Sequence, residues 1–265
     1  MLLREVEYAK PGSVAEALEL LAADDGARAL AGGQTLLNVM KARAASPDKL
    51  VDLNGLEELR GIELTGDGTL TIGAMTTYTE LVSSAEAKAR PILGEVCATI
   101  ADVQVRNRGT IGGNLCSNDP TNHLPPLMVA VEARMTIATA GGGEHEVPAE
   151  EFFLGVYLTA VGPGELLTRI SIPAGKKDGF AAVTLGTDGT CICTAAASVN
   201  GAVRVALGCV DAVPVLLVTD SPEEIPEAVR VADLQPPSDV HASAEYRTHL
   251  ASVLATRAAQ EAAGR

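Results

Sequence analysis

The chain has 265 residues, of which 47% are apolar, so it is long enough for two or three packed units. Its formal net charge of −14 and its 3% content of aromatic residues argue against nucleic acid as a partner, because phosphates would be repelled and stacking surfaces are scarce. No run of about 18 apolar residues occurs, so we expect no membrane-spanning helix. The N-terminus lacks the apolar stretch of a signal peptide, which predicts a cytoplasmic location.

The N-terminal residues predict a small α/β unit. Ser13 followed by Glu16 is typical of a capping box that opens a helix. A short apolar strand from Ala27 to Ala31 then runs directly into two glycines, and a helical pattern resumes from Leu36 to Ala42. With a closing strand at Lys49 to Leu53, the unit reads strand–helix–strand–helix–strand, and a glycine turn joins its second strand to its second helix.

That turn, Ala31-Gly32-Gly33-Gln34-Thr35-Leu36-Leu37, is called here the first glycine loop. Glycines let the backbone approach a ligand closely, and the Thr35 hydroxyl can bond a phosphate oxygen. A strand–turn–helix unit aims backbone N–H groups at one point, where anions bind. A lone Gly-Gly pair, however, is more often a turn that merely needs small residues. Neither G-x-G-x-x-G nor G-x-x-x-x-G-K-[ST] occurs in the chain, so the usual dinucleotide and P-loop devices are excluded.

A second glycine loop, Thr110-Ile111-Gly112-Gly113-Asn114, lies far along the chain. Its flanks, residues 100–109 and 115–126, are polar and show little periodicity, and Arg106 and Arg108 bring positive charge into an acidic chain. A stretch of this kind is costly to order unless a ligand binds there. The sequence therefore predicts a nucleotide cofactor held between two loops that are distant in sequence.

Downstream elements divide into a second and a third unit. Alternating apolar residues predict two hairpins, around 62–72 and 135–147, and helical patterns are predicted near 77–82, 91–101 and 126–133. Pro, Gly and Lys cluster near 173–179 and indicate a boundary. Strands near 181–185 and 191–199, an Asn200-Gly201 turn, a return strand and two alanine-rich helices follow. We therefore expect domains at 1–173, with subunits of about 1–55 and 56–173, and at 174–265.

The five cysteines and four histidines show no metal-ligand spacing. Cys191 and Cys193 would share one face of a strand, where small buried side chains are a more common interpretation than a redox or metal pair. We expect no metal site, and we expect the cysteines to be reduced thiols. His123 stands out because it follows the second glycine loop.

The two loops, their spacing, and the segments 151–159 (with its Phe152-Phe153-Leu154-Gly155-Val156-Tyr157 run) and 165–173 carry a family resemblance. Together they are similar to the FAD-binding medium subunit of the molybdenum hydroxylases, such as carbon monoxide dehydrogenase, xanthine dehydrogenase and aldehyde oxidoreductase. The resemblance covers nearly the whole chain. It implies an α+β fold with an α/β N-terminal unit, in which a two-part FAD-binding domain of the PCMH type precedes a small C-terminal domain of antiparallel sheet plus helices.

The resemblance also implies a set of residues around a non-covalent FAD. One side of the pyrophosphate would lie in the first glycine loop. Its other side and the flavin end would lie against the second glycine loop. Ile100 and Ala101 would line the path of the cofactor, and Leu167 would pack near the adenine. The full set is Leu30, Ala31, Gly32, Gly33, Gln34, Thr35, Leu36, Ile100, Ala101, Thr110, Gly113, Asn114, His123, Leu167 and Thr184. None of them is expected to act as a catalytic acid or base.

Two residues depart from the family pattern. His123 falls where the family usually carries an Asp on a cofactor hydroxyl, so a negative charge is lost there. Thr184 falls where some relatives carry a Lys, and the following residues 185–190 lack the charged residues common in that strand. These changes bear on the flavin environment and the electron acceptor, and the fold does not depend on them.

The function that the resemblance implies is electron transfer. A molybdopterin-binding large subunit would oxidise the substrate, a small subunit with two iron–sulfur clusters would relay electrons, and the flavin of this chain would pass them to an external acceptor, within a dimer of heterotrimers. The alternatives are a stand-alone FAD-dependent oxidoreductase and a degenerate nucleotide-binding module. We expect the segment from Asn118 to Pro126, with Leu124-Pro125-Pro126 exposed, to form part of the partner surface.

Overall fold

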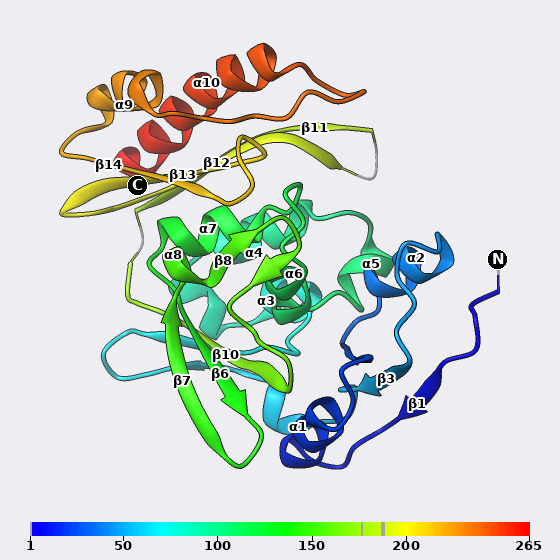
Figure 1. Cartoon of the computed structure of the whole chain (residues 1–265). Helices are drawn as coiled ribbons and strands as arrows, with labels where there is room; N and C mark the ends of the chain where they lie inside the picture. Colours follow the sequence, from blue (N-terminus) through cyan, green and yellow to red (C-terminus); the bar gives the residue numbers. More distant parts are fainter. Residues whose placement is uncertain (1, 176, 187–188) are drawn as a thin grey trace.

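The computed structural model describes residues 2–175, 177–186 and 189–265, and its elements form three groups (Figure 1). The first group surrounds a three-stranded sheet, the second a five-stranded sheet and the third a four-stranded sheet. In the view of Figure 1 the third group lies above the second, and the first group lies below and to the right. The mixture of helices with mostly antiparallel sheets confirms the predicted α+β class.

The first group is the predicted small α/β unit. Its parallel sheet has the order β1-β3-β2. Helix α1 begins where the Ser13 hydroxyl accepts a hydrogen bond from the Glu16 N–H at 3.2 Å, while the Glu16 carboxylate accepts from the Gly12 N–H at 2.7 Å. The elements are β1 (Glu7–Ala9), α1 (Val14–Ala22), β2 (Ala27–Leu30), α2 (Leu36–Lys41) and β3 (Lys49–Asp52).

The second group is built on an antiparallel sheet of order β4-β5-β10-β6-β7. Both predicted hairpins are present, and β10 pairs between them. The strands are β4 (Ile62–Leu64), β5 (Leu70–Gly73), β6 (Arg134–Thr139), β7 (Gly143–Pro148) and β10 (Glu165–Ile172), and a separate hairpin joins β8 (Phe153–Gly155) to β9 (Leu158–Thr159). The helices are η1 (Glu57–Leu59), α3 (Tyr78–Ser83), η2 (Glu86–Ala89), α4 (Ile92–Thr99), α5 (Val103–Arg106), α6 (Ile111–Ser117), α7 (Leu124–Ala130) and α8 (Ala149–Phe152).

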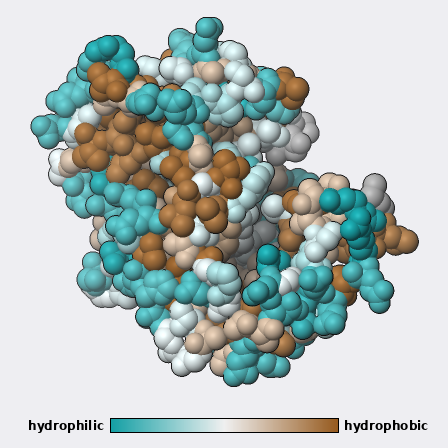
Figure 2. Space-filling model, viewed as in Figure 1, coloured by the Kyte–Doolittle hydropathy of each residue, from teal (hydrophilic) through white to brown (hydrophobic). Residues whose placement is uncertain are grey.

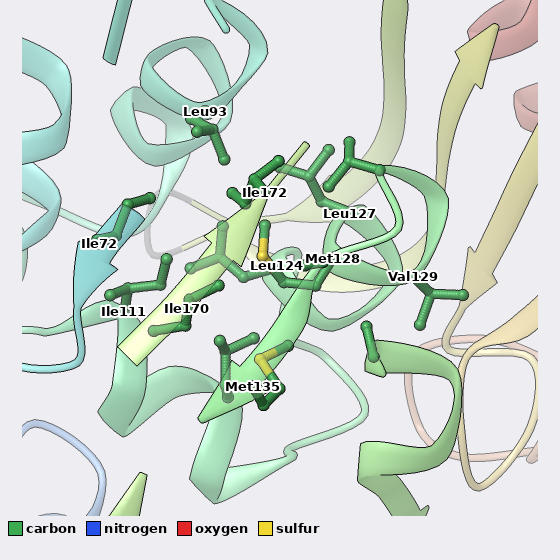
Figure 3. Close-up of a cluster of buried hydrophobic side chains, with 14 of the residues drawn as sticks. Ile72, Leu93, Ile111, Leu124, Leu127, Met128, Val129, Met135, Ile170 and Ile172 are labelled. Atoms are coloured by element: carbon green, nitrogen blue, oxygen red, sulfur yellow. The ribbon is translucent and has the colours of Figure 1, made fainter. Parts of the chain in front are cut away.

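The core of this group lies between the sheet and helices α4, α6 and α7 (Figure 3). Ile72 and Ile170 from neighbouring strands meet Ile111 and Leu124 from α6 and α7, and all four side chains are completely or almost completely buried. Burying a side chain of this size contributes about 1.5–3 kcal/mol. The second glycine loop is therefore anchored to the core by Ile111.

The third group is formed by the elements from Asp178 onwards. Its sheet has the order β11-β12-β13-β14, and the Asn200-Gly201 turn joins β12 to β13 as expected. Strand β12 is buried on both faces because α10 packs on one and α7 of the second group on the other. The elements are β11 (Asp178–Leu185), β12 (Thr190–Asn200), β13 (Ala202–Gly208), β14 (Val215–Thr219), η3 (Pro222–Glu224), α9 (Ile225–Val231) and α10 (Ala244–Gly264). Strand β14 has no counterpart in the sequence prediction.

The expectation of an exposed Leu124-Pro125-Pro126 is wrong. All three residues lie in α7 and are buried, because this helix is packed between its own sheet and strands β12 and β13. The exposed apolar residues nearby are those of the β8–β9 hairpin, where Leu154, Val156, Tyr157 and Leu158 each expose about half of their surface or more. Figure 2 shows hydrophobic surface gathered on the left side of this view.

All five cysteines are unpaired thiols, and four of them are buried. Cys191 and Cys193 lie in the buried strand β12, which agrees with their interpretation as small buried side chains. Within the described ranges, no group of acidic, histidine and cysteine side chains is arranged to hold a metal ion. The same residues include no helix that is both long and apolar enough to cross a membrane.

Candidate functional site

The two glycine loops touch each other. A Cβ on Gly32 would stand 2.0 Å from the carbonyl oxygen of Arg108, just before the second loop. A Cβ on Gly113 would lie 3.5 Å from the Cβ of Ala31. The fold therefore brings together two segments that are distant in sequence, and the absence of side chains at these glycines makes the approach possible.

The first glycine loop presents a run of backbone donors without acceptors. The N–H groups of residues 32–36 make no hydrogen bond to any residue that the structure describes. Gly33 takes a φ of +74°, the left-handed region that glycine favours, and so turns the loop tightly. The Thr35 side chain makes no capping bond to α2, so its hydroxyl is also free to bond a ligand. Successive unpaired N–H groups around a tight turn form a concave site for anions.

The second glycine loop is different, because its backbone is already satisfied. The N–H groups of residues 111–114 all donate to oxygens within the second group, on Thr76, Ala74 and Thr110, at 2.9–3.1 Å. This segment forms the first turns of helix α6, with Thr110 as its N-cap. The second loop therefore offers side chains to a ligand, including the Thr110 hydroxyl, whose oxygen accepts from Gly113 while its hydrogen remains available.

Two buried polar atoms near this loop have no partner. Five buried side-chain atoms lack a hydrogen bond in the described chain, and two of them, Asn114 Oδ1 and His123 Nδ1, belong to residues predicted to touch the cofactor. Buried polar groups are nearly always paired in native proteins. Together with the free N–H groups of the first glycine loop, these atoms fit a cofactor that carries both anionic and hydrogen-bonding groups.

His123 lies where the second and third groups meet. Its ring packs edge-on against Phe180 of β11, with ring centroids 5.4 Å apart, and the residue is only 6% exposed. Burial lowers the pKa of His123 to about 4, so the imidazole is neutral near pH 7. A neutral imidazole can donate from one nitrogen and accept at the other, which is a different capacity from that of the Asp usual in the family.

The remaining predicted residues are spread more widely. Ile100 and Ala101 form a turn after α4 that Arg106 holds by donating to both carbonyl oxygens, at 2.9 and 2.6 Å. Leu167 is a core residue of β10 with 3% exposure, and Thr184 is exposed near the end of the edge strand β11. Of the residues after Thr184 that depart from the family pattern, Thr187 and Asp188 lie outside the described residues. The structure therefore brings the two glycine loops together, whereas Leu167 lies in the second sheet and Thr184 in the third.

A polar cavity of about 260 Å³ opens beside the second loop and is lined in part by Thr110, Arg60 and Glu80. The Glu80 carboxylate accepts from both the backbone and the hydroxyl of Thr77, at 2.6 and 2.7 Å, and pairs with Arg60 at 3.5 Å. This cavity thus contains its own anion. Arg60 and Arg108 line the same cavity, so its charge is mixed. The donors of the first glycine loop bond none of the described residues, which leaves them available to an anion.

Comparison with known proteins identifies the family of the chain. Residues 4–175 match the family model described as the FAD binding domain in molybdopterin dehydrogenase. The carbon monoxide dehydrogenase medium chain of Afipia carboxidovorans is 38% identical over 100% of this chain and 99% of that protein. The medium chain from Hydrogenophaga pseudoflava is 46% identical over 66% of this chain, which spans 61% of that relative. The solved structure of Hydrogenophaga pseudoflava carbon monoxide dehydrogenase contains a chain that superposes with a TM-score of 0.91 at 35% identity, covering 100% of this chain and 99% of that one.

The matching family model and the relatives define a flavoprotein of the electron-transferring class. The chain belongs to the family of FAD-binding domains of molybdopterin dehydrogenases. It is an oxidoreductase subunit that carries FAD, and molybdopterin belongs to another subunit of such an enzyme.

Proposed function

We propose that the first glycine loop holds the pyrophosphate of FAD, with Thr110, Gly113 and Asn114 on the opposite wall. The observation that carries this proposal is the unbroken run of unpaired N–H groups from residue 32 to residue 36. A hydrogen bond to a charged group contributes about 1.5–3 kcal/mol, so a few of these donors suffice for firm binding. The chain offers this anion site despite a net charge of −14, because neutral backbone groups, and not Lys or Arg, provide it.

His123 and Asn114 would meet the part of FAD beyond the pyrophosphate. Their unpartnered buried atoms supply one acceptor and one position that donates or accepts. We keep Leu30, Leu36, Ile100, Ala101, Leu167 and Thr184 as further proposed contacts. For Leu167 and Thr184 this requires that the cofactor reach the second sheet and the edge of the third. We also propose that residues 1–173 form the FAD-binding domain and residues 174–265 the C-terminal domain.

The chain transfers electrons within a larger enzyme. Bound FAD supplies the redox chemistry, and the protein supplies position and a fixed polar environment. The chain accepts electrons from the iron–sulfur clusters of a small partner subunit, while a large subunit carries molybdopterin and oxidises the substrate. Because His123 is neutral and buried, it would offer a hydrogen bond to the cofactor and would not gain or lose a proton near pH 7. We expect the assembly to be a dimer of heterotrimers.

We place this enzyme in the cytoplasm. The five unpaired thiols support that location, because secreted proteins of an oxidising compartment usually carry disulfides. Fractionation of cells that express the chain, with a periplasmic and a cytoplasmic marker protein, tests the placement; recovery with the periplasmic marker would refute it.

Two experiments distinguish the proposed function from its alternatives. The purified chain should bind FAD and release it as a yellow supernatant on acid precipitation, because the cofactor is non-covalent. Co-expression with a molybdopterin-binding large subunit and a two-cluster small subunit should give a complex that reduces an acceptor when substrate is added. Turnover of a small organic substrate by the isolated chain, at about 1 per second or faster, would establish a stand-alone oxidoreductase instead. Absence of a flavin absorption band after incubation with FAD would indicate a degenerate module.

A further inference from the structure

The first glycine loop is bonded by the side chain of Asn54, which also lines the polar cavity beside the second loop. Asn54 follows strand β3, and its Nδ2 donates to the carbonyl oxygen of Ala31 at 2.9 Å. The preceding residue, Leu53, donates its backbone N–H to the carbonyl oxygen of Leu30 at 3.0 Å. Two successive carbonyl groups at the entrance of the loop are therefore turned towards β3.

The direction of these carbonyls fixes the direction of the donors. A trans peptide is planar, so the N–H of one residue points away from the C=O of the residue before it. With the Ala31 carbonyl directed at Asn54, the N–H of Gly32 must point to the other side, away from β3. Gly32 N–H is the first of the unpaired donors, and a rotated Ala31–Gly32 peptide would withdraw it from the anion site.

Asn54 is itself oriented by a buried carboxylate. Asp52 is 8% exposed, and its Oδ1 accepts from the Asn54 backbone N–H at 2.9 Å and from Asn54 Nδ2 at 2.7 Å. Its Oδ2 accepts from the Tyr8 hydroxyl at 2.5 Å. Both partners of the Asn54 amide nitrogen are acceptors, so only one orientation of the amide satisfies them.

The same contacts keep Asp52 ionised. Burial acts to raise its pKa, but the hydrogen bonds from Tyr8 and Asn54 outweigh burial, and the pKa of Asp52 is lowered below its ordinary value. A carboxylate accepts and cannot donate, so it holds the Asn54 amide in one orientation across the neutral pH range. The series Tyr8–Asp52–Asn54–Ala31 thus links strand β1, through β3, to the first glycine loop.

We propose that Asn54 is a positioning residue for FAD, which sets the Ala31–Gly32 peptide so that the first glycine loop presents its N–H groups to the pyrophosphate. This inference rests on the proposed function of that loop. Asn54 does not itself contact the cofactor in this proposal. Asn54 acts on FAD through the Ala31–Gly32 peptide, and Tyr8 and Asp52 act by orienting Asn54.

Two variants remove the donor in different ways. Asn54→Asp keeps the shape of the side chain but removes its hydrogens and places a charge beside Asp52. Asn54→Leu removes the donor without adding charge. Binding of FAD to the apo form of the full chain, measured by quenching of flavin fluorescence, should weaken at least tenfold in both variants. Tyr8→Phe should weaken it by a smaller factor, about two- to fivefold, because the amide of Asn54 keeps its bonds to Asp52.

Asn200→Asp is the matched control. It makes the same chemical change on the turn between β12 and β13, in the third sheet. Its affinity for FAD should stay within twofold of the wild type. Thermal unfolding of each apo variant shows whether the chain is still folded, and if Asn54→Asp fails to fold, Asn54→Leu and Tyr8→Phe keep the comparison possible.

ADP and adenosine separate a pyrophosphate effect from a general loss of structure. Competition with FAD should show that both Asn54 variants lose affinity for ADP by the same factor as for FAD, while adenosine binds as in the wild type. Unchanged FAD binding in both folded variants, or a loss for FAD without a loss for ADP, would overturn the role of Asn54. A wild-type chain that binds ADP no better than adenosine would instead refute the placement of the pyrophosphate on the first glycine loop.

Discussion

The carbonyl oxygen of Arg108 occupies the place where a side chain on Gly32 would begin. A Cβ at residue 32 would stand 2.0 Å from that oxygen and 3.0 Å from the Cα of Gly109. The obstacle is backbone, which cannot rotate aside as a long side chain can. Gly32 is therefore required for the contact between the first glycine loop and the segment that leads into the second.

We expect Gly32→Ala to separate the two loops. Forcing a methyl group into a packed contact typically costs about 1–3 kcal/mol, so the free energy of unfolding of the apo chain should fall by that amount. The FAD affinity should fall at least tenfold, because the walls of the site no longer meet. Urea unfolding and fluorescence titration measure the two effects; a variant with wild-type stability would show that the loops do not touch in solution.

Gly33→Val and Gly113→Val test the glycines at the proposed cofactor surface. At Gly33 the φ of +74° strains any branched side chain, and at Gly113 a Cβ would lie 2.9 Å from the Thr110 hydroxyl that caps α6. Both variants should lose FAD binding while the far-UV circular dichroism of the apo chain stays nearly unchanged. Gly66→Val, where a Cβ meets open space, is the control and should bind FAD normally. Equal FAD affinity in all three variants would make the loops structural turns only.

His123 should make the chain less stable in acid. Burial lowers its pKa from 6.5 to about 4, so between these values the unfolded chain binds a proton that the folded chain does not. This contribution to stability is complete above about pH 6.5 and is lost as the pH falls towards 4, by a total of about 3 kcal/mol. His123→Gln should remove this part of the pH dependence. The test is urea unfolding of the wild type and of His123→Gln at several pH values from 7 to 4.5. If the free energy of unfolding fell equally with pH in both proteins, the burial of a neutral imidazole would be contradicted.

Arg90 and Asp178 form a buried ion pair between the second and third groups. The guanidinium donates twice to the carboxylate, at 2.9 and 2.8 Å, and also bonds the Ser198 hydroxyl at 3.0 Å. Asp178→Ala leaves a buried positive charge unpaired, and we expect a loss of about 3–5 kcal/mol.

The exposed pair Arg134–Glu146, with side chains 51% and 49% exposed, provides the control for Asp178. Glu146→Ala should cost less than about 1 kcal/mol because solvent screens the pair. The double variant Arg90→Met with Asp178→Leu should recover much of the stability lost in Asp178→Ala, since it buries no charge. Denaturant unfolding measures the stability of all three variants. If Asp178→Ala and Glu146→Ala lost a similarly small amount of stability, the second and third groups of elements would not pack together firmly.

Local patterns in the sequence predicted the elements that depend on near neighbours. The Ser13 cap, the strand that precedes Gly32-Gly33, the two hairpins of the second group and the Asn200-Gly201 turn are all present. Each rests on side-chain alternation, a capping hydroxyl or a glycine conformation within a few residues. The family resemblance, carried by the two glycine loops and their spacing, is confirmed by the comparisons.

Contacts between distant segments could not be read in the same way. Residues 111–117 form a helix despite two glycines, because their N–H groups find acceptors on Ala74, Thr76 and Thr110 and because Ile111 is anchored in the core. Leu124-Pro125-Pro126 looked exposed in a polar stretch, yet the third sheet covers it.

The sequence by itself determined that two glycine loops exist and that they belong to an FAD-binding family. Only the tertiary structure decided which N–H groups are available to a ligand. Those of the first loop bond no described residue, whereas those of the second loop are bonded within the second group. Asn54 sets the orientation of the Ala31–Gly32 peptide in the first loop. The physical reason is that a backbone donor is free or satisfied according to which acceptor lies within about 3 Å of it. For Ile111 and Gly112 these acceptors are the carbonyl oxygens of Thr76 and Ala74, tens of positions away, which only the packed chain brings into place.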